Sequence, residues 1–309
     1  MIKRAITDPD LLVIVGSGRS GTTYLQEVLC RSLGIAYGPE PKFVVSYLRK
    51  IGHFGDLEQE INLRRLVETI CREPYFEYIE KWHKFRLTPD DILNEVREPT
   101  YKSVVLAIFQ AFANNRNMTR LGYKDPTDVR YISEIAELFP SARFIHILRD
   151  GRDVAYSMLK FIWGPTNLYA GSREWARATL KGLDDGRALG SRYFEMRYED
   201  LIMKPKQVVP DLASFIEGGD SSGASAAILE DVLQTSNTDA LYGWKRHFDR
   251  QQNYLCEAAA KPVLEACGYE TEFDDPHISS SKVAYYLSRS FIRQGVNHVY
   301  RRMTNWRLE

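Results

Sequence analysis

The sequence has few cysteines and no long apolar segment. Its four cysteines, Cys30, Cys71, Cys256 and Cys267, include no CxxC pair. This scatter excludes the usual zinc spacings and a disulfide framework, and free thiols are typical of a reducing compartment. No stretch approaches the ~20 apolar residues that span a bilayer, and residues 1–10 lack the apolar run of a signal peptide. We therefore expect a cytoplasmic protein without a metal site.

The chain also lacks net charge. Its 41 Lys and Arg residues balance 41 Asp and Glu residues, whereas proteins that coat nucleic acid normally carry a basic excess. The hydrophobic fraction of 44% excludes wholesale disorder. Its 309 residues are enough for one large α/β domain. These features predict a globular protein that has no nucleic-acid partner.

A glycine-rich loop follows the first apolar run. Leu11–Val15 is five consecutive apolar residues, which is typical of a strand buried on both faces of a parallel sheet. Gly16 to Gly21 come directly after it, and a helical pattern begins at Thr22 and stops at Gly34. In this layout, backbone N–H groups and the helix N-terminus favour a bound phosphate.

The loop has the glycine spacing of a Walker A motif, but Thr22 stands at the lysine position. In nucleotide triphosphatases that lysine reaches the terminal phosphates, and the Ser or Thr after it holds magnesium. The only cationic side chain in this loop is Arg19. The loop therefore predicts phosphate binding and disfavours transfer of the γ-phosphoryl group of ATP.

The remaining pattern predicts an α/β fold. Phe144–Leu148 is a second buried strand and Tyr193–Tyr198 a short one, with helical stretches between them. We expect a P-loop-like doubly wound parallel sheet flanked by helices, in a single domain over residues 1–281. Residues about 43–115 are mostly helical and poor in glycine, and we expect them to form an insertion that receives the acceptor.

Two motifs in this order resemble those of the sulfotransferases that use 3′-phosphoadenosine 5′-phosphosulfate (PAPS). Val15–Leu25 is similar to the 5′-phosphosulfate loop of that family, and Arg149–Ser157 resembles its 3′-phosphate motif. Gly122–Pro126, Arg197–Leu201 and Gly243–Arg246 also resemble segments of the family. The chain looks closer to the bacterial and tyrosylprotein-like branch than to the cytosolic phenol and steroid branch. The resemblance implies sulfuryl transfer without a metal.

The resemblance assigns the nucleotide contacts. The residues implied for the 5′-phosphate and its sulfate are Arg19, Ser20, Gly21, Thr22 and Thr23. Arg149 and Ser157 would bind the 3′-phosphate. Arg149 follows a strand end, where α/β sheets bind ligands, and Ser157 lies about two turns into the next helix. The alternative for Arg149 is a surface salt bridge with Asp150 or Asp153.

Glu40 and Lys124 are the candidate catalytic residues. A Lys before Asp-Pro, as at Lys124, is similar to that of tyrosylprotein sulfotransferases, and it would stabilise charge on the departing phosphate. The alternative is a solvated lysine in a turn. Glu40 resembles the general base of the same branch. The alternative base is a histidine, either His53 or His83.

Some residues have two interpretations each. Tyr198 contacts the adenine or packs in the core, and Trp244, Lys245 and Arg246 cover the nucleotide or form a surface basic cluster. The aromatic residues between Tyr75 and Phe85 line an acceptor pocket or, as their helical spacing favours, the core.

The balanced charge hides a basic C-terminus. Residues 282–309 hold six Lys or Arg and one Glu. Helical spacing also joins the apolar residues Ile292, Val296, Val299 and Met303. We expect a basic amphipathic helix, which either docks on the body or makes peripheral contact with a membrane surface.

Together these features predict a PAPS-dependent sulfotransferase that acts by direct in-line transfer and releases 3′-phosphoadenosine 5′-phosphate (PAP). The acceptor is a hydroxyl or amine of a glycan, a lipid-linked sugar, a protein tyrosine or a small phenol. One alternative is an ATP-dependent small-molecule kinase, against which Thr22 counts. Another is a non-catalytic nucleotide-binding protein of the same fold, against which Glu40 and Lys124 count. The sequence does not set the oligomeric state.

Overall fold

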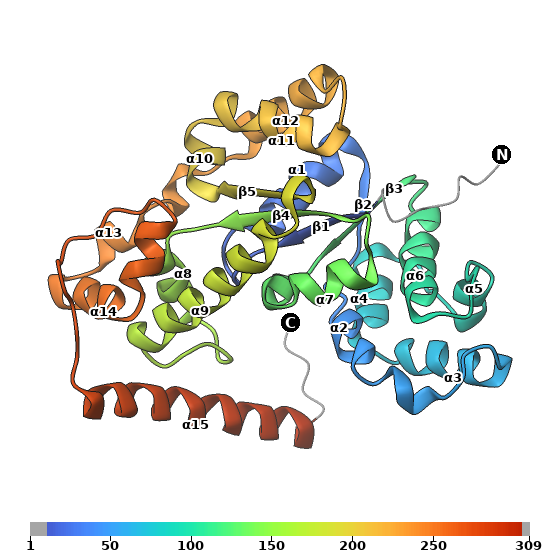
Figure 1. Ribbon diagram of the computed structural model, residues 1–309, viewed down its shortest axis with the longest axis horizontal. Coiled ribbons are helices and arrows are strands. Elements are labelled where there is room, and N and C mark those ends of the chain that lie inside the picture. Colours follow the sequence, from blue (N-terminus) through green and yellow to red (C-terminus); the bar gives the residue numbers. More distant parts are fainter. Residues whose placement is uncertain (1–10, 305–309) are drawn as a thin grey trace.

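A five-stranded parallel sheet forms the centre of the molecule (Figure 1). The computed structural model describes the backbone of residues 11–304 and the side chains of residues 11–293. The strand order is β2-β3-β1-β4-β5. The strands are β1 (Leu11–Val15), β2 (Ile35–Tyr37), β3 (Arg120–Lys124), β4 (Arg143–Leu148) and β5 (Tyr193–Arg197). Because β1 pairs in parallel with both β3 and β4, the carboxyl ends of these three strands lie side by side.

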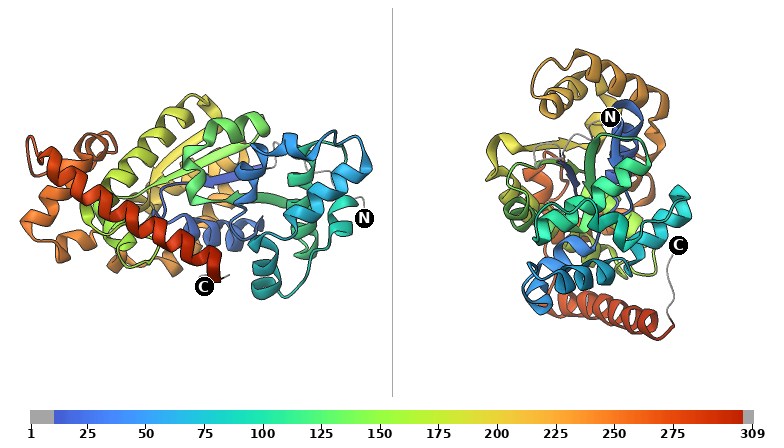
Figure 2. Two further views of the ribbon diagram at one scale, coloured as in Figure 1. Left: turned by 90° about the horizontal axis from the view of Figure 1, so that it is seen from below. Right: turned by 90° about the vertical axis from the view of Figure 1, so that its right-hand side faces the viewer.

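Helices connect and cover the strands on both faces (Figures 1 and 2). The α-helices are α1 (Thr22–Leu33), α2 (Phe43–Leu48), α3 (Glu60–Ile70), α4 (Pro74–His83), α5 (Pro89–Leu93), α6 (Tyr101–Asn115), α7 (Ile132–Leu138), α8 (Gly151–Met158), α9 (Leu168–Arg187), α10 (Tyr198–Met203), α11 (Pro205–Glu217), α12 (Ser222–Thr235), α13 (Gly243–His247), α14 (Arg250–Ala266) and α15 (Ser280–Thr304). Short 3₁₀ helices are η2 (Ile51–Phe54), η3 (Pro126–Arg130), η4 (Gly190–Arg192) and η5 (Thr238–Ala240). The predicted doubly wound parallel sheet is confirmed.

The two faces of β1 belong to two separate hydrophobic cores. Leu12 and Ile14 pack with residues of α1, α11 and α12. Leu11, Val13 and Val15 pack with α7 and with the helices of the 43–115 segment. All five side chains are buried, which explains why the strand has no polar alternation.

Two strands of the sheet lie outside the predicted ones. β2 has three residues, too few for a recognisable pattern, and β3 contains Gly122 and a basic residue at each end. Gly122 is required because a Cβ there would lie 2.2 Å from Cε1 of Tyr37 on β2. The ring of Tyr37 lies close against the backbone of β3 at this glycine, so β3 lacks the continuous apolar run of β1 and β4.

The long helix α15 lies along the outside of the molecule (Figures 1 and 2). Its Ser290 hydroxyl is buried against Thr166, and Asn167 donates a hydrogen bond to the carbonyl of Tyr286. Its first half is therefore docked on the start of α9. The rest of the predicted stripe and tail lies outside the described side chains: Val296, Val299, Met303, Arg301, Arg302 and Arg307. Among the described residues, no helix has the length and apolar character needed to cross a membrane.

Candidate active site

The glycine-rich loop is held in one conformation between β1 and α1. Arg19 and Gly21 have positive φ angles of 72° and 94°. A Cβ on Gly21 would lie 2.4 Å from Cδ2 of Tyr198, so only glycine fits there. No side chain caps α1, whose first residue is Thr22. The first N–H groups of this helix are therefore available to an anion.

Two buried polar groups beside the loop have no hydrogen-bond partner among the described residues. They are the hydroxyl of Ser20, which is 0% exposed, and Nε of Arg149. An unpartnered buried polar group is costly, and such groups are rare in native proteins. A phosphate or sulfate oxygen would accept a hydrogen bond from either donor, so the residues present fit an anionic ligand.

Arg19 joins the two residues expected at the 3′-phosphate. Nη1 of Arg149 donates to the carbonyl of Arg19 at 3.1 Å, and Nε of Arg19 donates to Oγ of Ser157, also at 3.1 Å. Burial, and then the charge of Arg149, lowers the pKa of Arg19. An anion beside Arg19 would offset this loss of favour for its charge. The fold thus brings Arg19, Arg149 and Ser157 together from three elements.

Lys124 and Glu40 meet beside the same loop. Nζ of Lys124 lies 2.9 Å from Oε1 of Glu40 and 3.3 Å from Oγ1 of Thr23. The Lys124 side chain is 6% exposed, whereas that of Glu40 is 36% exposed and also faces Lys42 at 3.8 Å. Lys124 is the last residue of β3 and Thr23 is the second residue of α1, so the sheet itself positions a cation next to the phosphate loop. A solvated lysine in a turn does not describe this arrangement.

Two buried carboxyl groups, those of Asp125 and Asp128, lie near the Lys124–Glu40 pair. Asp125 is fully buried and accepts hydrogen bonds from Thr127, and Asp128 accepts one from the hydroxyl of Tyr123. Burial, and then the charge of Glu40, raises the pKa of Asp125; burial, and then the charge of Asp125, raises that of Asp128. Sequence reasoning missed both residues, although Asp125 directly follows Lys124 in a segment that it singled out.

Tyr198 packs against the loop and also lies beside Arg149. Its ring is 7% exposed and packs on Gly21, yet the guanidinium carbon of Arg149 lies 5.1 Å from the ring centroid. Lys245 and Arg246 on α13 lie differently. Nζ of Lys245 lies over the rings of Tyr242 and Trp244, and Arg246 donates to the carbonyls of Leu241 and Asp239, which precede α13. Among the described contacts, neither basic side chain reaches the phosphate loop.

The two histidines lie apart from the ion pair. His83 contacts Arg116 through Nδ1 and packs edge-on against Phe112, and burial followed by the charge of Arg116 lowers its pKa. His53 is exposed on η2. In the described part of the chain, neither histidine forms a hydrogen bond or ion pair with Glu40 or Lys124. Of the three candidates for the base, Glu40 is the one that contacts Lys124.

The chain is similar to several curated proteins and solved structures. It is 22% identical to protein-tyrosine sulfotransferase 1 of Danio rerio over 87% of this chain and 75% of that protein. It is 24% identical to the protein-tyrosine sulfotransferase of Drosophila melanogaster over 67% of this chain and 38% of that protein. A sulfotransferase domain from the curacin biosynthetic pathway matches with a TM-score of 0.52 and 20% identity, over 84% of this chain and 98% of that one.

The cytoplasmic location expected from the sequence is wrong. The matching protein-tyrosine sulfotransferases are Golgi-resident enzymes, which conflicts with it. Few cysteines were a poor guide to the compartment, because a domain with a large hydrophobic core needs no disulfide.

A family model described as the sulfotransferase family matches residues 9–218. This span contains both motifs predicted to bind anions, Glu40, Lys124 and all five strands. The matching curated relatives also agree with the tyrosylprotein-like branch. The chain therefore belongs to the sulfotransferase family.

Proposed function

We propose that this protein is a PAPS-dependent sulfotransferase that transfers a sulfuryl group to an acceptor hydroxyl or amine. The observation that carries the proposal is the meeting of two groups of residues at the carboxyl ends of β1, β3 and β4. One group is the Lys124–Glu40 pair, and the other is Arg19 with Arg149 and Ser157. A base, a cation for the leaving group and an anion site together are what sulfuryl transfer requires.

The loop and its flanking arginines would bind the nucleotide. Backbone N–H groups of the loop and of Thr22 and Thr23, with the Ser20 hydroxyl, suit the 5′-phosphosulfate. Arg149 and Ser157 suit the 3′-phosphate. Arg19 belongs to the loop and contacts both of these residues. Tyr198 offers its ring beside Arg149, where the nucleoside would follow.

The chemistry is a direct displacement at sulfur. Glu40 accepts the proton of the acceptor hydroxyl while the acceptor oxygen forms its bond to sulfur. The bond from sulfur to the bridging oxygen breaks, and its electron pair remains on the 5′-phosphate of PAP. Lys124 and the loop N–H groups stabilise that negative charge, as preorganised donors do in other group transfers. Lys124 lies within reach of both Glu40 and Thr23, so one residue links base and leaving group.

The matching relatives support a hydroxyl acceptor. They are named protein-tyrosine sulfotransferases, and a tyrosine carries the phenolic hydroxyl that this mechanism sulfates. We propose a tyrosine-bearing acceptor as the first class to test, with glycans, lipid-linked sugars and free phenols as the other classes.

Calorimetry with PAP and an acceptor screen with labelled PAPS test the proposal. We expect PAP to bind without added metal and label to pass to one acceptor class, identified by mass spectrometry of the product. Absence of PAP binding would overturn the assignment. Magnesium-dependent turnover of ATP would favour the kinase, and PAP binding without transfer to any acceptor class would favour a non-catalytic protein.

A further inference from the structure

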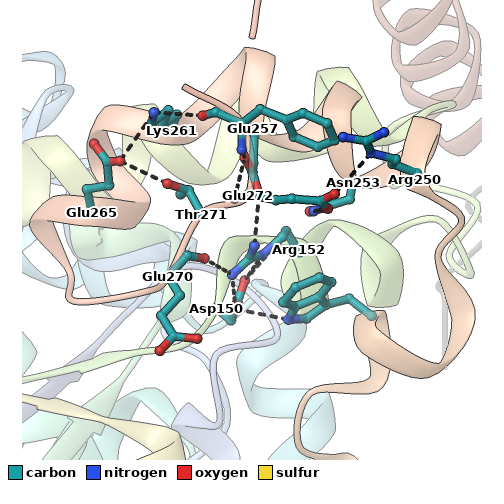
Figure 3. Close-up of polar contacts among 12 residues, drawn as sticks. Asp150, Arg152, Arg250, Asn253, Glu257, Lys261, Glu265, Glu270, Thr271 and Glu272 are labelled. Atoms are coloured by element: carbon teal, nitrogen blue, oxygen red, sulfur yellow. Dashed lines mark hydrogen bonds and ion pairs between the residues drawn. The ribbon is translucent and has the colours of Figure 1, made fainter. Parts of the chain in front are cut away.

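A buried ion cluster joins two residues of the 3′-phosphate motif, Asp150 and Arg152, to Glu257 (Figure 3). Arg152, which is 2% exposed, donates to Asp150 through Nε at 3.0 Å and Nη2 at 2.8 Å, and to Glu257 on α14 through Nη1 at 3.2 Å. Nη2 also donates to the carbonyl of Glu270. Glu257 in turn accepts the backbone N–H groups of residues 272 and 273. One arginine thereby fixes the start of α8 against α14 and the chain that follows it.

Trp244 is attached to this cluster. Its indole Nε1 donates to Oδ2 of Asp150 at 3.0 Å, and its ring centroid lies 3.7 Å from the guanidinium carbon of Arg152. Its backbone N–H donates to Oδ1 of Asp153 at 2.8 Å. Asp150 is the N-cap of α8 and Asp153 lies in its first turn, so Trp244 fastens α13 to the helix that carries Ser157.

The same contacts reach Arg149. The Asp153 carboxylate that holds the Trp244 N–H lies 3.8 Å from Nη2 of Arg149. That Nη2 donates to the carbonyl of Ala240 in η5, four residues before Trp244. Arg149 is therefore held by the segment from Ala240 to Trp244, and the indole of Trp244 anchors the far end of that segment.

Packing alone does not fix Trp244. Its side chain borders a cavity of about 360 Å³ that is also lined by Asn253 and Tyr242. An aromatic ring beside open space keeps its place through directional contacts, here the hydrogen bond to Asp150 and the stacking on Arg152.

We propose that Trp244 is a positioning residue for recognition of the 3′-phosphate, supported by the Glu257–Arg152–Asp150 cluster. It holds η5 and α13 against α8, and so keeps Arg149 aligned for the 3′-phosphate, without contacting the sulfuryl group. This inference rests on the proposed function. It predicts a defect confined to the 3′-phosphate, because the 5′-phosphate loop is held by β1 and α1.

The Trp244→Phe variant tests this role because it keeps a ring and removes the indole N–H. The measurement is calorimetry with PAP and with 5′-AMP, which lacks the 3′-phosphate. We expect the ratio of the two dissociation constants, 5′-AMP over PAP, to fall by about tenfold, with 5′-AMP binding unchanged. In turnover assays, KM for PAPS should rise while kcat stays near the original value. Trp82→Phe, at an exposed position on α4, is the matched control and should leave the ratio unchanged.

Arg152→Lys provides a second measurement. It keeps one positive charge between the two carboxylates but loses the forked contact and the stacking on Trp244. We expect the same fall in the ratio. An unchanged ratio in both variants would overturn the inference, and so would equal weakening of PAP and 5′-AMP, which indicates general loss of structure. If the unmodified protein fails to bind PAP, the proposed function fails instead.

Discussion

The nucleotide half and the helical insertion of this molecule are built on different principles. Around the carboxyl ends of the strands, the buried side chains include charged ones: Lys124, Asp125, Asp128, Asp150, Arg152, Asp153, Glu199 and Glu257. Within the described residues 43–115, the buried side chains are apolar or aromatic throughout. The buried hydroxyl of Tyr101 donates to backbone carbonyls of the same segment, those of Phe43 and Val44.

The buried charges of the nucleotide half orient its binding groups, whereas the apolar core of the insertion stabilises the fold. Buried charges are costly to hold and add little net stability, but they fix the directions of the groups they contact. An apolar core stabilises a fold without specifying exact directions. We therefore expect substitutions in the nucleotide half to change binding and catalysis, and substitutions inside the insertion to change stability. The following experiments test that division.

The largest expected effect is on turnover. Glu40→Gln keeps the shape of the side chain but removes the base, so kcat should fall by about 10²- to 10⁴-fold while PAP binding is retained. Steady-state assays and calorimetry with PAP measure the two quantities. Glu58→Gln, an exposed acid in the insertion, is the control. Turnover that survives in Glu40→Gln would exclude Glu40 as the base.

The insertion should show the opposite behaviour. Phe112→Ala empties a site on α6 that is 2% exposed and packs against His83 and Phe85. We expect the free energy of unfolding to fall by about 3–5 kcal/mol, with the dissociation constant of PAP unchanged in the folded protein. Denaturant unfolding measures the first quantity. Phe291→Ala, where the ring is 78% exposed, should cost almost nothing. A large change in PAP affinity in Phe112→Ala would contradict the division.

A smaller effect is expected from Arg149→Ala. Loss of a charge-assisted contact to the 3′-phosphate should raise the dissociation constant of PAP by about 10- to 100-fold. Arg187→Ala is the matched control, because Arg187 pairs with Glu195 at the surface. Equal PAP affinity in the Arg149→Ala variant would remove Arg149 from the nucleotide site.

The smallest effect is a pH dependence of stability. Burial raises the pKa of Asp128, so the folded protein holds this proton more strongly than the unfolded chain does. Its contribution to stability is complete below the ordinary carboxyl pKa and is lost as the pH rises through the folded value. Asp128→Asn should therefore be more stable than the original protein at pH 8, by about 1 kcal/mol or more, and the difference should vanish near pH 3.

Unfolding curves from pH 3 to pH 8 measure this difference. Asp184→Asn, at an exposed position on α9, is the control and should show no such trend. A difference for Asp128→Asn that is constant with pH would show that the carboxyl group is equally ionised in both states.

The sequence predicted those parts of the fold whose signal is local. β1 and β4 are uninterrupted apolar runs, and the loop between β1 and α1 is marked by its glycines. β3 was missed because its Gly122 is required by a contact with the ring of Tyr37, which lies 85 residues away in the chain. The local sequence pattern around a residue does not reveal such a long-range contact.

The same limit applies to the site. Glu40 and Lys124 were each identified by resemblance to a motif, but their pairing joins positions 84 residues apart. Likewise, nothing near Trp244 in the sequence points to Asp150, 94 residues away. Spatial pairing of polar groups becomes visible only when the strands are placed in order.

The left-handed backbone at Arg19 affects which substitutions at this position selection would favour. Glycine would adopt the φ of 72° with less strain, so Arg19→Gly is a route to a more relaxed loop. The same replacement deletes the guanidinium that touches Ser157. Selection for stability thus favours glycine at this position, and selection for activity favours arginine. A variant library selected for thermal stability alone would be enriched in Arg19→Gly.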